Sequence, residues 1–389
     1  MLLKFIFANR LAVVNSYDFI LKTNSTDLPK IIFTVTNDLS FDQRMHRIAG
    51  CLAENGYQVM LVGVKRADSI KLQKRSFTQY RLPCFAQNGP LFYIEYNFRL
   101  LVYLLFAKTD IICAIDLDTI LPCLFAAKLR NKKRVYDAHE YFTEQKEVRT
   151  RPNILRIWKL IEVFAVPKFP KGYTVNSKLA QLFYENHGVE YQIIRNVSIK
   201  YLLENTDIHP TNKFILYQGA VNEGRCFEEL IPAMKWVNAT LIIVGNGNFF
   251  SQAEALIRYF KLTHKIILRG SIPPDELRQL TQEAYIGVTL FESNGINQYY
   301  SLANRFFDYM MAGTPQICVN YPLYQEINQE HGFAYLIDNT HPLTIGDALN
   351  KLLEDDVLYT LLKQNCIKAR NLLNWENESH QLIEFYSQL

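Results

Sequence analysis

The stretch Ser301-Leu-Ala-Asn-Arg-Phe-Phe-Asp-Tyr-Met-Met-Ala-Gly-Thr-Pro315 decides the fold of this chain. It predicts a helix over Leu302–Met311 that Ser301 caps at its N-terminus, followed by a glycine turn. A short apolar strand is expected on either side of the stretch, at Ile286–Leu290 and at Gln316–Val319. Strand, helix and strand in this order form the repeating unit of a parallel α/β sheet.

The same alternation of strands and helices extends in both directions and forms two series, which the polar segment Glu204–Lys213 separates. Strands are expected at Ile31–Thr36, Gln58–Val64, Ile111–Ile115, Arg134–Tyr136 and Tyr173–Val175 in the first series, and at Phe214–Gln218, Thr240–Val244, Lys265–Leu268, Ile286–Leu290, Gln316–Val319 and Tyr335–Ile337 in the second. Two such series predict two Rossmann-like, doubly wound domains, residues 31–200 and 201–389, facing each other across a cleft. Residues 1–30 are an N-terminal extension, and a last helix near Leu382–Leu389 is expected to pack back on the first domain.

The composition is that of an ordinary globular protein. The 389 residues are 49% hydrophobic and 21% charged, with 42 Lys and Arg against 38 Asp and Glu. These values exclude a disordered, collagen-like or coiled-coil chain and a dedicated nucleic-acid binder. Seven scattered cysteines indicate free thiols in a reducing compartment. Because the N-terminus lacks a signal-peptide pattern and the apolar run Leu100–Ala107 is short, we expect a cytoplasmic protein and interpret Leu100–Phe106 as a core helix.

Loops at the carboxyl ends of the strands should hold the functional site. After the expected strand Phe214–Gln218, the chain runs through Gly219-Ala-Val-Asn-Glu-Gly224-Arg225 into a helix. Glycines let a phosphate approach the backbone, and Arg225 adds a cation near the helix start. A plain strand-to-helix turn with a surface arginine would have the same pattern. Gly245, in the next such loop, either shapes a wall of the site or simply ends its strand.

Three more stretches belong with residues 301–315: Tyr217-Gln-Gly-Ala-Val-Asn-Glu-Gly-Arg225, Val135-Tyr-Asp-Ala-His-Glu140 and Thr36-Asn-Asp-Leu-Ser-Phe-Asp-Gln-Arg-Met45. Together they resemble the retaining, nucleotide-sugar-dependent glycosyltransferases of the GT-B fold, the "glycosyl transferases group 1" or family 4 class. The resemblance runs from about residue 31 to the end of the chain. It implies transfer of a sugar, with retention, from a nucleotide-sugar to a saccharide or lipid-linked acceptor, in cell-envelope or exopolysaccharide synthesis.

The resemblance also implies roles on the donor side. It places Asp308 on the nucleotide ribose and Arg225 on the donor diphosphate, as a catalytic residue that neutralises the leaving group. The family's second diphosphate cation falls at Ala220 in this sequence, so Arg305 or Arg44 has to compensate.

The sequence departs from the family's pattern at one donor-sugar position. The family often has a glutamate eight residues before the ribose carboxylate, and Tyr300 stands there. Ser301 or the backbone at Asn294 and Gly295 is therefore expected to hold the donor sugar. The free amides at the start of the Ser301 helix, with Asn304 at the capping-box position, would suit a diphosphate.

The first domain is expected to supply the acceptor side. His139 follows a strand and, by the resemblance, binds a sugar hydroxyl or the reacting centre; a helix-capping or core histidine is the alternative. Asp116-Leu-Asp118 looks like the metal motif of the other, GT-A, fold. Because two Rossmann-like domains carry cationic phosphate ligands instead, we expect no metal and no cofactor beyond the donor, and assign Asp118 to an acceptor hydroxyl as a catalytic residue. The other predicted acceptor-side residues are Asn37, Asp38, Arg44 and Glu140.

Residues 149–171 are locally basic and contain Trp158. They predict either peripheral contact with the cytoplasmic face of a membrane or an ordinary amphipathic helix. Two other functions are compatible with the sequence: a sugar-nucleotide epimerase of the same fold, and a catalytically silent sugar-binding partner subunit.

Overall fold

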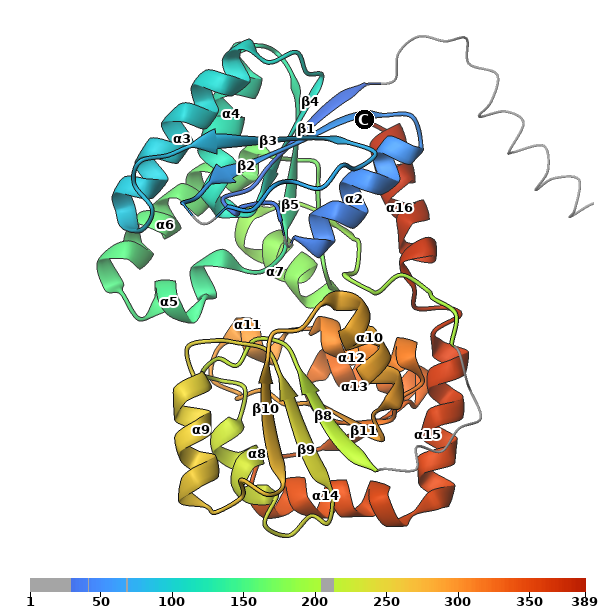
Figure 1. Cartoon of the computed structure of the whole chain (residues 1–389). Coiled ribbons are helices and arrows are strands. Elements are labelled where there is room, and N and C mark those ends of the chain that lie inside the picture. Colours follow the sequence, from blue (N-terminus) through green and yellow to red (C-terminus); the bar gives the residue numbers. More distant parts are fainter. Residues whose placement is uncertain (1–28, 41, 68, 204–212) are drawn as a thin grey trace, which may run out of the picture.

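The computed structural model describes residues 29–40, 42–67, 69–203 and 213–389. Most of the predicted N-terminal extension and of the predicted linker, residues 1–28 and 204–212, lies outside these ranges. Two parallel sheets, each covered by helices, form the described part of the chain (Figure 1). The predicted pair of Rossmann-like domains is confirmed.

The first sheet has the strand order β3-β2-β1-β4-β5-β6-β7. Its strands are β1 Lys30–Thr34, β2 Gln58–Lys65, β3 Thr78–Pro83, β4 Ile111–Ile115, β5 Lys133–Ala138, β6 Gly172–Thr174 and β7 Gln192–Ile193. Its helices are α2 Gln43–Glu54, α3 Gly89–Phe106, α4 Ile120–Leu129, α5 Lys146–Arg149, α6 Pro152–Ala165 and α7 Ser177–His187. The central strands β1 and β4 pair in parallel, with Phe33 opposite Cys113, and their continuous apolar runs are buried between the helix layers.

The second sheet has the strand order β10-β9-β8-β11-β12-β13. Its strands are β8 Phe214–Gln218, β9 Thr240–Val244, β10 Ile266–Gly270, β11 Ile286–Thr289, β12 Gln316–Val319 and β13 Ala334–Ile337. The helices of this half are α8 Phe227–Ala233, α9 Phe250–Tyr259, α10 Pro274–Glu283, α11 Ile296–Tyr299, α12 Asn304–Ala312, α13 Pro322–His331, α14 Pro342–Glu354, α15 Asp356–Ala369 and α16 Trp375–Ser387. In both sheets the strand order reverses beside the first strand, and ligands of such folds bind at this point.

The C-terminal helix α16 lies against the first domain, beside α2 (Figure 1). The buried Tyr386 ring meets the edge of Phe33 at a centroid distance of 6.0 Å, and its hydroxyl is 3.4 Å from that of Tyr173. At the other end of α16, Glu378 binds Arg195 at 3.0 Å. The chain therefore crosses between the domains twice, once after β7 and once before α16.

One sequence interpretation needs correction. Leu100–Phe106 is the last part of an 18-residue helix, α3, rather than a separate core helix. Leu100 and Leu104 are buried against the sheet, but Val102 and Phe106 point to solvent. The sequence could not separate the buried side chains from the exposed ones, because α3 is apolar on both faces. None of the helices in the described ranges has the length and hydropathy needed to cross a membrane.

Candidate donor and acceptor site

Two arginines of the second domain contact one aromatic ring at the carboxyl end of the sheet. The guanidinium carbons of Arg225 and Arg305 lie 4.4 and 4.5 Å from the ring centroid of Phe291. Arg305 Nη1 donates to the Tyr217 hydroxyl at 2.9 Å and Nη2 to the Leu290 carbonyl at 3.1 Å. Within the described ranges, Arg225 forms neither an ion pair nor a hydrogen bond.

Among the described residues, no carboxylate forms an ion pair with either cation. Burial lowers the pKa of Arg225 from its ordinary value, and repulsion from Arg305 lowers it further. An arginine stays protonated even so, and both side chains carry their charge at neutral pH. Adjacent, partly desolvated cations without a counter-ion favour a bound anion, above all a phosphate that accepts several charge-assisted hydrogen bonds.

Glycines keep the backbone beside this pair open. Gly219 and Gly245 have φ angles of 125° and 138°, which disfavour any side chain. A Cβ on Gly245 would lie 1.8 Å from the Gly219 carbonyl oxygen, so the two loops pack backbone against backbone. A Cβ on Gly219 would approach Arg305 Nη1 to 3.4 Å. The glycines therefore bring the two loops together, and Gly219 keeps the space beside Arg305 Nη1 free of a side chain of its own.

The predicted cap of the following helix is wrong. Helix α12 begins at Asn304, and Ala303 occupies the cap position without a side-chain hydrogen bond. The Ser301 hydroxyl instead donates to the Gln298 carbonyl at 2.9 Å, because the chain runs without helical structure from Ser301 to Ala303. Asn304 accepts from Asn196 at 2.7 Å in the segment that joins the domains. The exposed Asn294 and the adjacent Gly295, whose φ is 123°, lie in the loop before α11.

Asp308 lies where the second domain meets the connecting segment. Its carboxylate accepts from the Ser198 hydroxyl and, at 3.2 Å, from Gln218 Nε2 at the end of β8. Burial raises the pKa of Asp308, while the Ser198 hydrogen bond and the nearby Arg47 act in the opposite direction. The predicted ribose ligand is therefore fixed in orientation by groups from both sides of the domain boundary.

On the first domain, His139 lies between two aspartates at the ends of β4 and β5. Its Nε2 is 3.2 Å from Asp137 Oδ2 and its Nδ1 is 3.5 Å from Asp116 Oδ2. Arg44 also pairs with Asp137, at 3.0 Å, so Arg44 and His139 share the Asp137 carboxylate. Burial lowers the pKa of His139, but the two aspartates outweigh it and raise the pKa to about 9. The imidazole is therefore protonated at neutral pH.

Arg44 is accordingly committed to this histidine cluster. Of the two candidates for the missing second cation, Arg305 lies beside Arg225, whereas Arg44 is buried in the first domain and paired with Asp137. Arg44 also donates to the Ile194 carbonyl at 3.3 Å. Both of these partners of Arg44, Asp137 and Ile194, thus belong to the first domain.

Asp118 accepts a hydrogen bond from the Thr36 hydroxyl at 2.5 Å. Burial raises the pKa of Asp118 to about 6, against the effect of that hydrogen bond, and raises the pKa of Asp116 to about 6, against the effect of His139. Among the described residues no group of three or more His, Cys, Asp or Glu side chains is placed to hold a metal ion.

The remaining predicted acceptor residues fall into two groups. Asn37 and Asp38 organise their own loop: Asn37 Oδ1 accepts from the Leu39 amide, and Asp38 pairs with Arg81 at 2.6 Å. Glu140 instead faces the second domain, where it accepts from Asn297 Nδ2 at 3.4 Å and contributes to the electrostatic environment of Arg225. Glu140 thus connects the histidine cluster with the arginine pair.

Four residues of this site were missed by the sequence analysis: Tyr217, Phe291, Asp137 and Asn297. Asp137 is the next-to-last residue of β5 and Phe291 comes two residues after β11, and this position near a strand's carboxyl end is a signal that could have found them. Asn297 carries no such signal. Its amide bridges to the Tyr141 backbone, 156 residues away, with distances of 3.0 and 3.1 Å.

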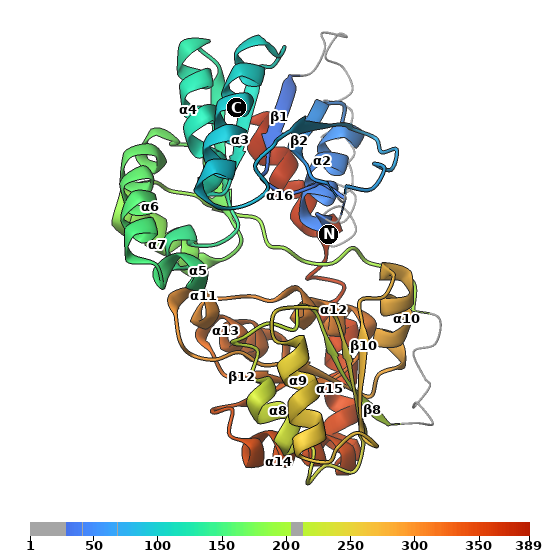
Figure 2. The same ribbon diagram turned by 60° about the vertical axis from the view of Figure 1, so that its left-hand side comes forward.

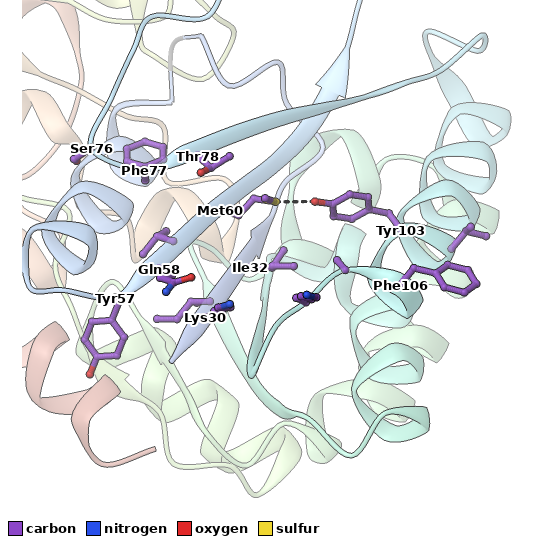
Figure 3. Close-up of a pocket in the computed structure, with 15 residues that line it drawn as sticks. Lys30, Ile32, Tyr57, Gln58, Met60, Ser76, Phe77, Thr78, Tyr103 and Phe106 are labelled. Atoms are coloured by element: carbon purple, nitrogen blue, oxygen red, sulfur yellow. Dashed lines mark hydrogen bonds between the residues drawn. The ribbon is translucent and has the colours of Figure 1, made fainter. Parts of the chain in front are cut away.

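A separate cavity of about 760 Å³ opens at the amino ends of the strands of the first sheet (Figure 3). Lys30, Gln58 and Thr78, at the starts of β1, β2 and β3, line it together with the end of α3. In Figure 3 the Tyr103 hydroxyl donates to Met60 Sδ across it, at 2.7 Å. Because the cavity lies at the amino ends of the strands, it is separate from the arginine and histidine clusters.

Two parallel α/β domains with their candidate residues at the carboxyl ends of the strands define the GT-B architecture, and solved structures of this class superpose on the chain. Sucrose-phosphate synthase from Thermosynechococcus elongatus matches with a TM-score of 0.72 over 92% of this chain and 98% of its own, at 16% identity. HepE from Anabaena, solved in complex with UDP-glucose, matches with a TM-score of 0.70 over 93% and 100%, at 14% identity. Likeness at these identities shows the fold.

Residues 201–370, most of the second domain, match the model of the family "Glycosyl transferases group 1". A curated relative, an uncharacterized glycosyltransferase from Methanocaldococcus jannaschii, is 24% identical over 186 residues, which are 46% of each chain. The match thus spans about half the length of this relative. The predicted fold and the resemblance to group 1 are confirmed.

Arg225 offers a direct test of the anion site. Arg225→Ala should weaken binding of UDP, ADP or GDP about ten- to hundredfold, because one charge-assisted contact is lost, while Arg225→Lys keeps most of the affinity. Calorimetric titration measures both. Arg258→Ala, at an exposed arginine on α9, is the control and should bind as the unaltered chain does. Unchanged affinity of Arg225→Ala would remove this residue from the site.

Asp118 gives a pH-dependent test of the cluster. Its pKa is about 6 in the folded chain against an ordinary value of 3.8, so folding disfavours the ionised form. The penalty is absent below about pH 3.8 and complete above about pH 6. Asp118→Asn should therefore raise the free energy of unfolding by about 1–3 kcal/mol at pH 8 and by much less at pH 4. Denaturant unfolding of both proteins at the two pH values measures this difference. An equal effect at both pH values would contradict the claim that burial raises the pKa of Asp118.

Proposed function

We propose that the chain is a glycosyltransferase that moves a sugar, with retention, from a nucleotide-sugar donor to a saccharide or lipid-linked acceptor in cell-envelope or exopolysaccharide synthesis. The observation that carries the proposal is the pair of adjacent cations beside a glycine-lined turn: the half-buried Arg225 and the buried Arg305, neither of which has an ion-pair partner in the described part of the chain. The group 1 domain and the fold support it. A cytoplasmic location and peripheral contact with a membrane through residues 149–171 belong to the same proposal.

In this reaction the bond between the anomeric carbon and the diphosphate oxygen breaks while the acceptor oxygen bonds to that carbon on the same face. The acceptor proton passes to the leaving diphosphate. Negative charge grows on the diphosphate as its bond breaks, and Arg225 and Arg305 stabilise that charge because their positions are fixed beforehand. The acceptor side is assigned to the first domain: Asp118 accepts from the acceptor hydroxyl, and the protonated His139 lies beside it.

The donor is proposed to be a ribonucleotide sugar. HepE binds UDP-glucose, which makes UDP-glucose the first donor to try. Asp308, oriented by Ser198 and Gln218, is proposed to hold the ribose hydroxyls. Ser301 and the turn at Asn294 and Gly295 remain the proposed contacts of the donor sugar.

Tyr300 favours the alternative of a catalytically silent sugar-binding subunit, because a phenol cannot replace the family's carboxylate on the donor sugar. Arg305 favours an active enzyme instead, because it supplies a second cation in place of the one that the family has at the position of Ala220. An epimerase would use the same nucleotide site without an acceptor.

The purified chain should hydrolyse or transfer sugar from at least one member of a panel of nucleotide-sugars, and turnover should persist in EDTA, since the leaving group is assigned to arginines. Product analysis separates the alternatives. An epimeric nucleotide-sugar indicates an epimerase, and tight binding without turnover indicates a silent subunit. Loss of turnover in EDTA, restored by Mg²⁺ or Mn²⁺, would make Asp116 and Asp118 metal ligands instead.

Asp308→Asn should raise the donor KM, lower turnover and reduce the preference for ribose over 2′-deoxyribose donors, because the carboxylate that detects the hydroxyl is gone. Ser198→Ala is the matched control: it removes a neighbour of the same carboxylate but keeps its charge, and should retain most of the ribose preference. A full ribose preference in Asp308→Asn would leave Asp308 with a structural role.

A further inference from the structure

Helix α3 exposes one stripe of large apolar side chains. Leu91, Ile94, Phe98, Val102 and Phe106 follow each other at intervals of three or four residues, and therefore share one side of the helix. Phe98 is 67% and Phe106 83% exposed. The opposite side of α3 is already packed on the sheet. A helix that is apolar on both sides normally has a partner on both, so the outer side lacks one.

The two neighbouring helices extend this surface. Figure 2 shows α3, α4 and α6 together on one side of the first domain, away from α2 and α16. Tyr93 of α3 and Trp158 of α6 meet edge to face at 5.5 Å, so these helices lie side by side. The exposed apolar residues on the other two helices are Phe125 and Leu129 of α4 and Ile157, Leu160, Val163 and Phe164 of α6.

These three helices carry four basic and two acidic side chains. Their only carboxylates are Glu95, which pairs with Arg99 at 2.8 Å, and Glu162, which is buried against Thr143 and His187. Lys128, Arg156 and Lys159 are exposed and have no ion-pair partner in the described part of the chain. The surface therefore combines apolar side chains with cations and presents no free negative charge.

We propose that the outer face of α3, α4 and α6, the three-helix face, docks on a bilayer that contains anionic lipid. A bilayer supplies both complements at once: apolar interior for side chains such as Phe98 and Leu160, and phosphate headgroups for Arg156 and Lys159. The sequence had pointed to residues 149–171 only. The structure adds α3 and α4, whose exposed apolar side chains extend the surface beyond α6.

The docking face adjoins the proposed site. Helix α6 follows α5 directly, and Lys146 of α5 binds Glu223 of the second domain at 2.9 Å. A membrane under the three-helix face would thus lie near the first-domain side of the site. Docking on a bilayer also implies that the acceptor is lipid-linked, with its lipid held in the bilayer. This consequence rests on the proposed function.

The test uses the full chain and vesicles of phosphatidylcholine with or without phosphatidylglycerol, without donor or acceptor. The chain should sediment with the anionic vesicles, less so at high salt, and little with phosphatidylcholine alone. Leu160→Glu and Phe98→Ser should each weaken binding about tenfold or more, through loss of one buried apolar side chain. Val357→Glu, at an 82% exposed valine on α15 of the other domain, is the control and should bind normally.

Equal vesicle binding by Leu160→Glu and the unaltered chain would overturn the proposal, as would no binding to anionic vesicles. A dimer in solution that Leu160→Glu dissociates would also overturn it, by assigning the face to a second copy. Turnover of a water-soluble acceptor without vesicle binding would defeat the docking alone. Vesicle binding without turnover on any donor would leave the docking in place and defeat the proposed transfer.

Discussion

The interaction on which the proposed site depends is the close approach of two like charges, Arg225 and Arg305, which have no ion-pair partner in the ranges that the structure describes. Such an arrangement costs free energy in the empty protein and is tolerated because other contacts hold it. Both guanidinium groups contact the Phe291 ring, and Tyr217 with the Leu290 carbonyl fixes Arg305. Their positive charge is thus in place before any anion arrives.

The second requirement is a fixed relation between the two domains. Asp308 reaches Ser198 on the connecting segment, Asn297 bridges to Tyr141, and α16 returns to the first sheet through Tyr386. These contacts place the protonated His139 and its aspartates on the same side of the molecule as the arginine pair. Acceptor-side and donor-side groups then come from different domains, as the proposed transfer needs.

Much of the fold could be predicted because buried parallel strands are continuous apolar runs, such as Ile111–Ile115. The arginine pair was partly predictable, since Arg225 follows a glycine turn. The start of α12 was not, because the Ser301 hydroxyl donates to the Gln298 carbonyl instead of accepting from a helix amide, while the Tyr324 hydroxyl accepts from the Ala303 amide. The exposed apolar side of α3 could not be predicted either, because the sequence does not show whether an apolar side chain faces a sheet or solvent.

The most direct test of the central claim compares the affinity of the chain for a nucleoside diphosphate and for its parent nucleoside, UDP against uridine, by calorimetry. Two preformed charge-assisted contacts predict that the diphosphate binds at least about a hundredfold more tightly. The difference should shrink as salt is added. Equal affinity of UDP and uridine, with ADP against adenosine and GDP against guanosine giving the same result, would contradict the account.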